Sequence, residues 1–224
     1  MQAMILAAGL GSRMRPLTHH MPKPLVKVFG TSMITRLISQ LHQAGTHQFS
    51  INVGYLGQDI IHHVEAVPEF SSLTFNWYLE DPKQLLGTVR PIARALNDFK
   101  DHPFWLVSSD IVTNFNFTPP SMQHLAHLYC IETESNPDFN LTNQEISSTP
   151  PNVCFSGIGY FHPSFFHNVP DSPISLGKWV HLQLNKGPIQ GALLASSLWS
   201  NVGDLATLKS LNKNPVDRPI DLRS

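Results

Sequence analysis

The chain has 224 residues, 42% of them hydrophobic and 14% charged, and its net charge of −1 disfavours nucleic-acid binding, which requires a basic surface. No run of about 18 apolar residues occurs and no charged segment precedes the first apolar stretch, so neither a membrane span nor a secretory signal is expected. Only Cys130 and Cys154 are present, without metal-binding spacing, which favours a cytoplasmic protein with reduced thiols.

The first half of the chain alternates short apolar runs with helical patterns. Strands are predicted over 4–8, 49–53, 73–79 and 104–108, and helices over 34–41, 58–67 and 93–99. Gly45 and Pro68 are the expected ends of the first two helices. Alternation at these intervals produces βαβ units with right-handed crossovers. The sequence therefore predicts an α/β fold, a Rossmann-like, mainly parallel mixed sheet flanked by helices.

The second half of the chain is less regular. Its apolar patterns predict a helix over 122–128, strands over 138–146 and 153–161, a helix over 174–184, a strand over 190–195 and a helix over 205–211. The loop between the two neighbouring strands is too short for a crossover, so they are expected to be antiparallel. We expect one domain over residues 1–212, with halves 1–118 and 119–212 sharing one sheet, and a weakly ordered tail over 213–224.

A glycine-containing turn follows the first predicted strand and indicates the kind of ligand. Gly9 and Gly11 allow the backbone to approach a phosphate closely, and successive N–H groups in such a turn bind anions. Arg13 and Lys23 add positive charge nearby, which predicts a nucleoside triphosphate site. A dinucleotide-binding fingerprint would need a third glycine where Met14 stands, and the Gly-Lys-Ser/Thr of a P-loop is absent.

Two linked motifs of this region carry a family resemblance. Leu6-Ala7-Ala8-Gly9-x-Gly11-x-Arg13 and Pro22-Lys23-Pro24-Leu25 resemble the signature of the sugar-1-phosphate nucleotidylyltransferases. The likeness continues in the segments 86–92, 104–110, 155–160 and 199–203. It implies the nucleotide-diphospho-sugar transferase fold, which is GT-A-like, and an enzyme that joins a nucleoside triphosphate to a sugar-1-phosphate with release of pyrophosphate.

Within the family, the short length and the segment 136–141 are most similar to the N-acetylmuramate-1-phosphate uridylyltransferases. This resemblance implies UTP and N-acetylmuramate 1-phosphate as substrates, Mg²⁺ as cofactor, and a role in peptidoglycan recycling for the cell wall. No nucleic-acid or membrane partner is expected, and the sequence does not indicate an oligomeric state.

The resemblance also implies a role for each matching residue. Arg13 and Lys23 would act on the phosphates as catalytic cations, while the first half of the chain binds nucleotide and the second binds sugar. The expected nucleotide-binding residues are Leu6, Ala7, Ala8, Gly9, Gly11, Arg13, Lys23, Gly87 and Thr88. The expected sugar contacts are Gly157 and Gly159, and the expected metal ligands are Asp110 and Asn201. A phosphate monoester with a second pKa of about 6 is already ionised at neutral pH, so no general base is required.

The segment 199–203 resembles the family pattern Trp-x-Asp-Val-Gly, and Asn201 departs from it at the Asp position. A neutral carbonyl replaces a carboxylate there, although Mg²⁺ is often held by one or two carboxylates together with phosphates and waters. Asp204 either replaces the missing ligand or caps the next helix, and Arg90 either narrows the base pocket or faces solvent. Three hypotheses follow: an active transferase with altered metal dependence, a nucleotide-binding homologue with little turnover, or a transferase of other specificity, such as a mannose-1-phosphate guanylyltransferase.

Overall fold

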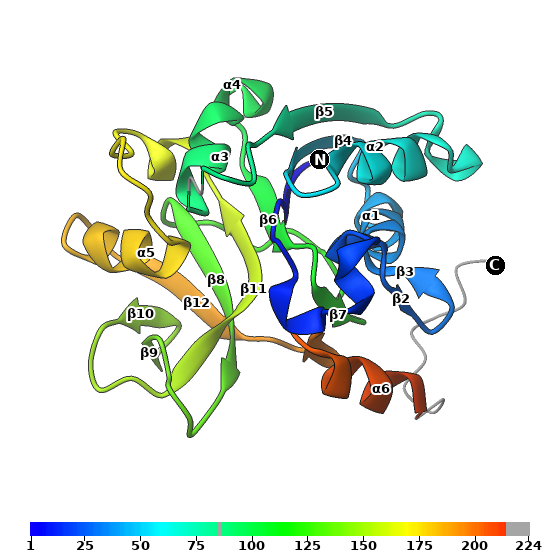
Figure 1. The fold of residues 1–224 in the computed structure, drawn as a ribbon. Helices are drawn as coiled ribbons and strands as arrows, with labels where there is room; N and C mark the ends of the chain where they lie inside the picture. Colours follow the sequence, from blue (N-terminus) through cyan, green and yellow to red (C-terminus); the bar gives the residue numbers. More distant parts are fainter. Residues whose placement is uncertain (85–86, 214–224) are drawn as a thin grey trace.

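The computed structural model describes residues 1–84 and 87–213, and the expectations for Leu86 and for residues 214–224 of the tail lie outside them. Helices lie on both sides of a nine-stranded sheet with the strand order β5-β4-β1-β6-β11-β8-β12-β10-β9 (Figure 1). In chain order these strands are β1 (Gln2–Ala7), β4 (Gln48–Val53), β5 (Thr74–Leu79), β6 (Phe104–Ser108), β8 (Ala126–Glu132), β9 (Asn140–Thr142), β10 (Glu145–Ser147), β11 (Val153–Phe161) and β12 (Ile189–Leu193).

The sheet is mixed, as the sequence predicts. β1 pairs in parallel with β4 and β6, and β4 with β5, so the first half of the chain forms one parallel block. β11 joins this block antiparallel to β6 and also pairs antiparallel with β8. β12 is parallel to β8, whereas β10 is antiparallel to both β12 and β9. The strands β1, β4, β6 and β8 consequently end at the same edge of the sheet.

Five helices cover the two faces of this sheet. They are α1 (Met33–Gln43) and α2 (Gly57–Glu65) on one face, and α3 (Val89–Arg94), α4 (Leu96–Phe99) and α5 (Leu176–Leu184) on the other (Figure 1). α1 ends as predicted, because Gly45 has a φ of 94° and the N–H of Thr46 donates to the carbonyl of Leu41. Within the described part of the chain, no helix has the length and apolar character needed to cross a membrane.

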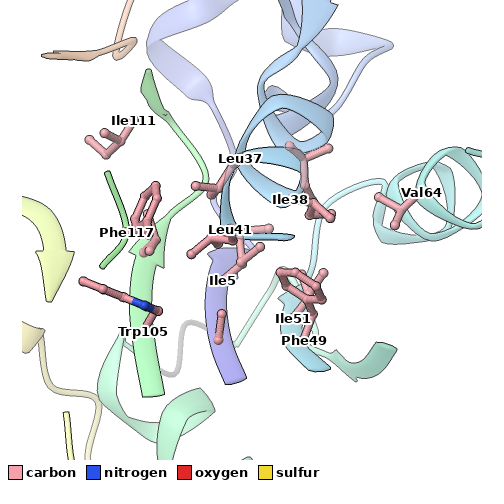
Figure 2. Packing of buried hydrophobic residues seen from close by; sticks show 14 of the residues in the cluster. Ile5, Leu37, Ile38, Leu41, Phe49, Ile51, Val64, Trp105, Ile111 and Phe117 are labelled. Atoms are coloured by element: carbon pink, nitrogen blue, oxygen red, sulfur yellow. The ribbon is translucent and has the colours of Figure 1, made fainter. Parts of the chain in front are cut away.

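Apolar side chains of β1 alternate between the two faces and connect two cores. Ile5 packs in the cluster that contains the apolar stripe of α1, whereas Met4 packs in the cluster under α3, α4 and α5. Figure 2 shows Leu41 of α1 over Ile5, and Ile38 of α1 on the side of Ile51 of β4. Fully burying each such side chain contributes about 1.5–3 kcal/mol, so this packing fixes the carboxyl ends of the parallel strands relative to one another.

Short elements surround the carboxyl edge of the sheet. They are β2 (Lys27–Val28), β3 (Thr31–Ser32), β7 (Ile111–Thr113), β13 (Trp199–Asn201), α6 (Leu205–Lys213) and the 3₁₀ turns Ser12–Met14, Leu17–His19 and Lys23–Leu25. The 3₁₀ turns Pro68–Phe70 and Pro163–Phe166 lie at the opposite edge, before β5 and after β11. β7 and β13 form an antiparallel pair. A third apolar cluster joins Met14, Val112 and Val202 with one side of α6, and α6 lies beside the segment 12–19 (Figure 1). The last described segment of the chain is thus packed against one of the first.

The predicted helix over 122–128 is wrong, because the chain forms the strand β8 from Ala126 onwards. The residues from Ala126 to Cys130 are all buried, since β8 lies between β11 and β12 with both faces covered. A strand buried on both faces lacks the alternation of apolar and polar residues, and its short apolar run resembles a buried helix.

The predicted strand over 138–146 is also wrong in part, because it is two strands. β9 and β10 form a hairpin whose two-residue turn is Asn143-Gln144, with φ of 52° and 64°. The hairpin region contacts β11 through one antiparallel bridge between Phe139 and Val153. The helical prediction over 93–99 corresponds to two helices separated at Ala95: α3, which begins earlier at Val89, and α4, which ends at Phe99 as predicted. Lys213 was predicted to be the first residue of the weakly ordered tail, but it belongs to α6.

Candidate nucleotide-binding site

A cavity of about 500 Å³ opens at the carboxyl ends of β1, β4 and β6. In the sheet, β1 lies between β4 and β6. The chain passes from β1 through α1 to β4 on one side, and it reaches β6 on the other side only later. Open α/β sheets bind ligands at such a point, where the strand order reverses. Of the predicted nucleotide-binding residues, all but Ala7 line the cavity: Leu6, Ala8, Gly9, Gly11, Arg13, Lys23, Gly87 and Thr88.

The glycine turn is held in place by the segment that follows it. Gly11 has a φ of 63°, and a Cβ there would lie 3.1 Å from both the Cβ of Lys23 and the Cγ2 of Thr18. The buried Thr18 hydroxyl donates a hydrogen bond of 2.8 Å to the carbonyl of Gly11. The two sequence motifs are therefore packed directly against each other, and Lys23 is brought to the same cavity as the turn.

Lys23 and Asp110 form an ion pair at the cavity wall. The Nζ of Lys23 lies 2.5 Å from Oδ2 of Asp110, with the two side chains 12% and 24% exposed. Asp110 connects β6 to β7, so it does not cap a helix. A cation that is expected to contact phosphate thus forms an ion pair with the carboxylate that is expected to bind a metal ion.

Arg13 is exposed at the other side of the turn and lines the cavity. In residues 1–84 and 87–213 its guanidinium has no carboxylate close enough to form an ion pair. A planar guanidinium with five donors matches phosphate oxygens, often with two parallel hydrogen bonds. Arg13 and Lys23 thus present positive charge to one cavity, which suits a polyanionic ligand.

Gly87 and Thr88 form the wall on the side of α5. A Cβ at Gly87, which has a φ of 72°, would lie 2.6 Å from the backbone nitrogen of Ile174. The hydroxyl of Thr88 accepts a hydrogen bond of 2.6 Å from the N–H of Leu176, at the start of α5. Arg90 instead approaches Asp171, with 3.4 Å between Nη2 and Oδ1, and it is not part of the cavity wall.

Asn52 and Glu80 line the cavity and were missed by the sequence predictions. The side chain of Asn52 accepts a hydrogen bond of 3.1 Å from the N–H of Ala7 and donates one to Glu80. Burial raises the pKa of Glu80, and the hydrogen bond from Asn52 opposes that rise. β4 alternates the polar residues Gln48, Ser50 and Asn52 with apolar ones, so the available signal was only that Asn52 stands near the carboxyl end of a predicted strand. Ala7 itself points into the core.

The structure does not bring Gly157 and Gly159 to this cavity, because neither lines it. Both lie in β11, and Gly157 lies at an irregularity of its pairing with β8. A Cβ at Gly157 would lie 2.8 Å from Cγ1 of Ile111, and one at Gly159 would lie 2.9 Å from Cζ of Phe161. Packing thus accounts for both glycines, and their contact with sugar stays a prediction.

Asn201 lies beside Asp110 without lining the cavity. It is an exposed residue of β13 whose register partner in β7 is Ile111. The next residue, Val202, donates a hydrogen bond of 2.9 Å to the carbonyl of Asp110. Asp204 caps α6, because its Oδ1 accepts a 2.8 Å hydrogen bond from the N–H of Thr207, which agrees with the second sequence interpretation.

The donor set around Asp110 fits a metal only with help from the ligand. No three His, Cys, Asp or Glu side chains in the described segments gather at a distance suited to one ion. Mg²⁺ is commonly bound by one or two carboxylates, with phosphate oxygens and waters completing the octahedron. Asp110 offers one carboxylate, and the amide oxygen of Asn201 lies on the adjacent segment. This set suits Mg²⁺ that is shared with a triphosphate.

Comparison with known proteins agrees with the site. Residues 2–131 match the family model for nucleotidyl transferases. The chain is 33% identical over 225 residues to the N-acetylmuramate alpha-1-phosphate uridylyltransferase of Neisseria meningitidis, covering 93% of this chain and 96% of that protein. It is 32% identical over 129 residues to the mannose-1-phosphate guanyltransferase of Schizosaccharomyces pombe, covering 57% of this chain and 35% of that protein.

Solved structures show the same fold. A putative glucose-1-phosphate thymidylyltransferase from Bacillus anthracis superposes with a TM-score of 0.83 at 17% identity, covering 99% of this chain and 98% of that chain. The CTP:phosphocholine cytidylyltransferase from Streptococcus pneumoniae gives 0.76 at 18% identity, over 95% and 97% of the two chains. The chain belongs to the nucleotidyl transferase family. This confirms the resemblance to the sugar-1-phosphate nucleotidylyltransferases and the expectation of an enzyme with that fold.

Proposed function

We propose that the protein transfers UMP from UTP to N-acetylmuramate 1-phosphate, forming the UDP-sugar and pyrophosphate with Mg²⁺ as cofactor. The observation that carries this proposal is the likeness to the Neisseria enzyme along 93% of the chain, combined with a cavity that holds both predicted cations. The route it would serve is cytoplasmic peptidoglycan recycling.

The reaction requires two polyanions to be brought together in line. An ionised oxygen of the sugar phosphate attacks the α-phosphorus, the bond to the β-phosphate oxygen breaks, and pyrophosphate leaves. The nucleophile is already anionic, so the protein supplies positioning and charge stabilisation rather than a base.

The residues of the cavity divide this work. Arg13 would bind the β- and γ-phosphates and stabilise the leaving pyrophosphate, while Lys23 would contact the α-phosphate. An ammonium has three donors, so Lys23 can bind phosphate and remain beside Asp110. Asn52 and Glu80 offer polar groups to the base or ribose. Bound Mg²⁺, held by Asp110 and Asn201, would neutralise phosphate charge during the displacement.

Two other candidates have specific support. A mannose-1-phosphate guanylyltransferase is favoured by the relatives that match about half of the chain. A nucleotide-binding homologue with little turnover is favoured by the carbonyl of Asn201 where a carboxylate is expected, and by the ion pair that already engages Asp110.

The test measures pyrophosphate release by purified protein with UTP or GTP, with N-acetylmuramate 1-phosphate or mannose 1-phosphate, in Mg²⁺ or Mn²⁺. We expect release only with the uridine nucleotide and the muramate substrate. Release with GTP and mannose 1-phosphate would replace the proposal by the second candidate. Thermal stabilisation by UTP without release in any combination would indicate the binding homologue instead.

A further inference from the structure

Gly203 lies close to the guanidinium of Arg13, although the two residues lie near opposite ends of the chain. Gly203 follows β13 and is buried, and it lines the same cavity as Arg13. A Cβ added at Gly203 would lie 3.1 Å from Nη2, 3.4 Å from Cζ and 3.5 Å from Nη1 of Arg13. These are the three nearest atoms to that position, so the side of the residue that lacks a side chain faces the guanidinium.

The backbone of Gly203 does not require glycine. Its φ lies outside the left-handed region, unlike that of Gly11 or Gly87. Alanine could therefore adopt the same backbone conformation without strain. The guanidinium of Arg13 is therefore the group that a side chain at position 203 would meet first.

The segment around Gly203 is fixed on both sides. Val202 is fully buried and its N–H bonds to the carbonyl of Asp110, while Asp204 caps α6 through Thr207. Arg13, in contrast, has an exposed side chain on a turn. A methyl group at position 203 would consequently displace the guanidinium rather than the segment β13–α6.

Asp204 adds an electrostatic component to this contact. Hydrogen bonds from Thr207 lower the pKa of Asp204, and the positive charge of Arg13 contributes to the same lowering. The carboxylate is engaged in capping and has no ion pair with Arg13. Asp204 therefore interacts with the guanidinium through a longer-range attraction and not through a direct ion pair.

We propose that Gly203 is a positioning residue, whose bare Cα supports the guanidinium of Arg13 at the angle needed to bind the leaving pyrophosphate. This inference rests on the proposed function. It assigns to the segment 201–204 a role in phosphate binding that does not depend on Asn201 as a metal ligand.

The test compares Gly203→Ala, Arg13→Ala and the double variant with the wild type. The matched control is Gly187→Ala, since Gly187 also lacks a positive φ and a Cβ there would meet no atom within 4 Å. We expect Gly203→Ala to raise the KM for the nucleoside triphosphate about tenfold and to leave the KM for the sugar phosphate within about twofold. In the Arg13→Ala background the same substitution should change neither constant by more than about twofold, because the group it displaces is gone.

The outcomes separate this inference from the proposed function. If the wild type neither binds nor turns over any nucleotide, the proposed function fails. If the wild type is active, two results would overturn the positioning role. One is a Gly203→Ala variant with the same KM for the nucleoside triphosphate as the wild type. The other is an equal rise in this KM when Gly203→Ala is introduced into the wild type and into the Arg13→Ala variant. A lower melting temperature of Gly203→Ala relative to the wild type supports the contact only if the double variant melts at the same temperature as Arg13→Ala.

Discussion

Lys23 and Asp110 are 87 residues apart in the chain, and their side chains meet at the cavity wall. A metal bound at Asp110, as proposed, would compete with the ammonium for carboxylate oxygens, so the charge on neighbouring groups would decide how strongly the metal binds. Asn201 contributes no charge to this balance. If Asn201 is a metal ligand as proposed, this departure from the family pattern would affect metal affinity more directly than nucleotide affinity.

We expect Asn201→Asp to lower the Mg²⁺ concentration for half-maximal pyrophosphate release by about three- to tenfold, because a second carboxylate adds charge to the site. The measurement is a Mg²⁺ titration at saturating substrates. Asn116→Asp is the control, since it introduces the same charge at an exposed position outside the cavity wall. An unchanged titration for Asn201→Asp would show that residue 201 is not a ligand.

Among the secondary-structure elements, the β9–β10 hairpin shows how a local conformation can conflict with the residues that adopt it. Its turn places Asn143 and Gln144 at positive φ, which Asn tolerates better than Gln. The carbonyl of Gln144 accepts a hydrogen bond from the N–H of Gly191 in β12. The turn is therefore imposed by the sheet as much as by its own sequence.

We expect Gln144→Gly to raise the free energy of unfolding by about 0.5–1 kcal/mol, because relief of the left-handed strain exceeds the entropy cost of glycine. Urea unfolding would measure the change. Thr142→Gly, an exposed strand position in the same hairpin, should instead reduce stability. Equal destabilisation by both substitutions would contradict this account of the turn.

Across the whole molecule, an aromatic cluster joins the parallel block to the second half of the sheet. Trp105 of β6 packs against Tyr129 of β8 and Tyr160 of β11. His127 of β8 lies 4.9 Å from the ring of Tyr129, and neither of its ring nitrogens has a hydrogen-bond partner among the described residues. Burial lowers the pKa of His127, so the folded protein holds this imidazole neutral.

This histidine predicts a pH dependence of stability. The unfolded chain binds a proton at His127 near its ordinary pKa of about 6.5, while the folded chain does so only at lower pH. Below about pH 6.5 the unfolding free energy should fall by up to about 1.4 kcal/mol per pH unit from this group alone. Urea titrations from pH 7.5 to 5.5 should therefore show a shallower decline for His127→Leu than for the wild type. Parallel declines would exclude His127 as the cause.

The first half of the fold and most of the nucleotide site were predictable because their determinants are local. The helix α1 carries a clear helical period, and β1 and β6 are short apolar runs that end at a glycine turn and at Asp110. The carboxyl ends of parallel strands meet at one edge. Gly9, Gly11, Arg13 and Asp110 stand directly after such strands, which is why the predictions place them in one cavity. The second half was predicted less well, since β8 is buried on both faces and its pattern carries no period.

The sequence by itself determined the family and the parallel block, and it singled out the two cations proposed to bind phosphate, because motif spacing and apolar period are properties of neighbouring residues. Only the tertiary structure decided which distant groups meet there: Lys23 with Asp110, Asn52 with Glu80, and Gly203 with Arg13. These contacts depend on strand order and on the packing of α6 against the segment 12–19. Such long-range geometry arises from the buried surface of the whole chain, which no local pattern encodes.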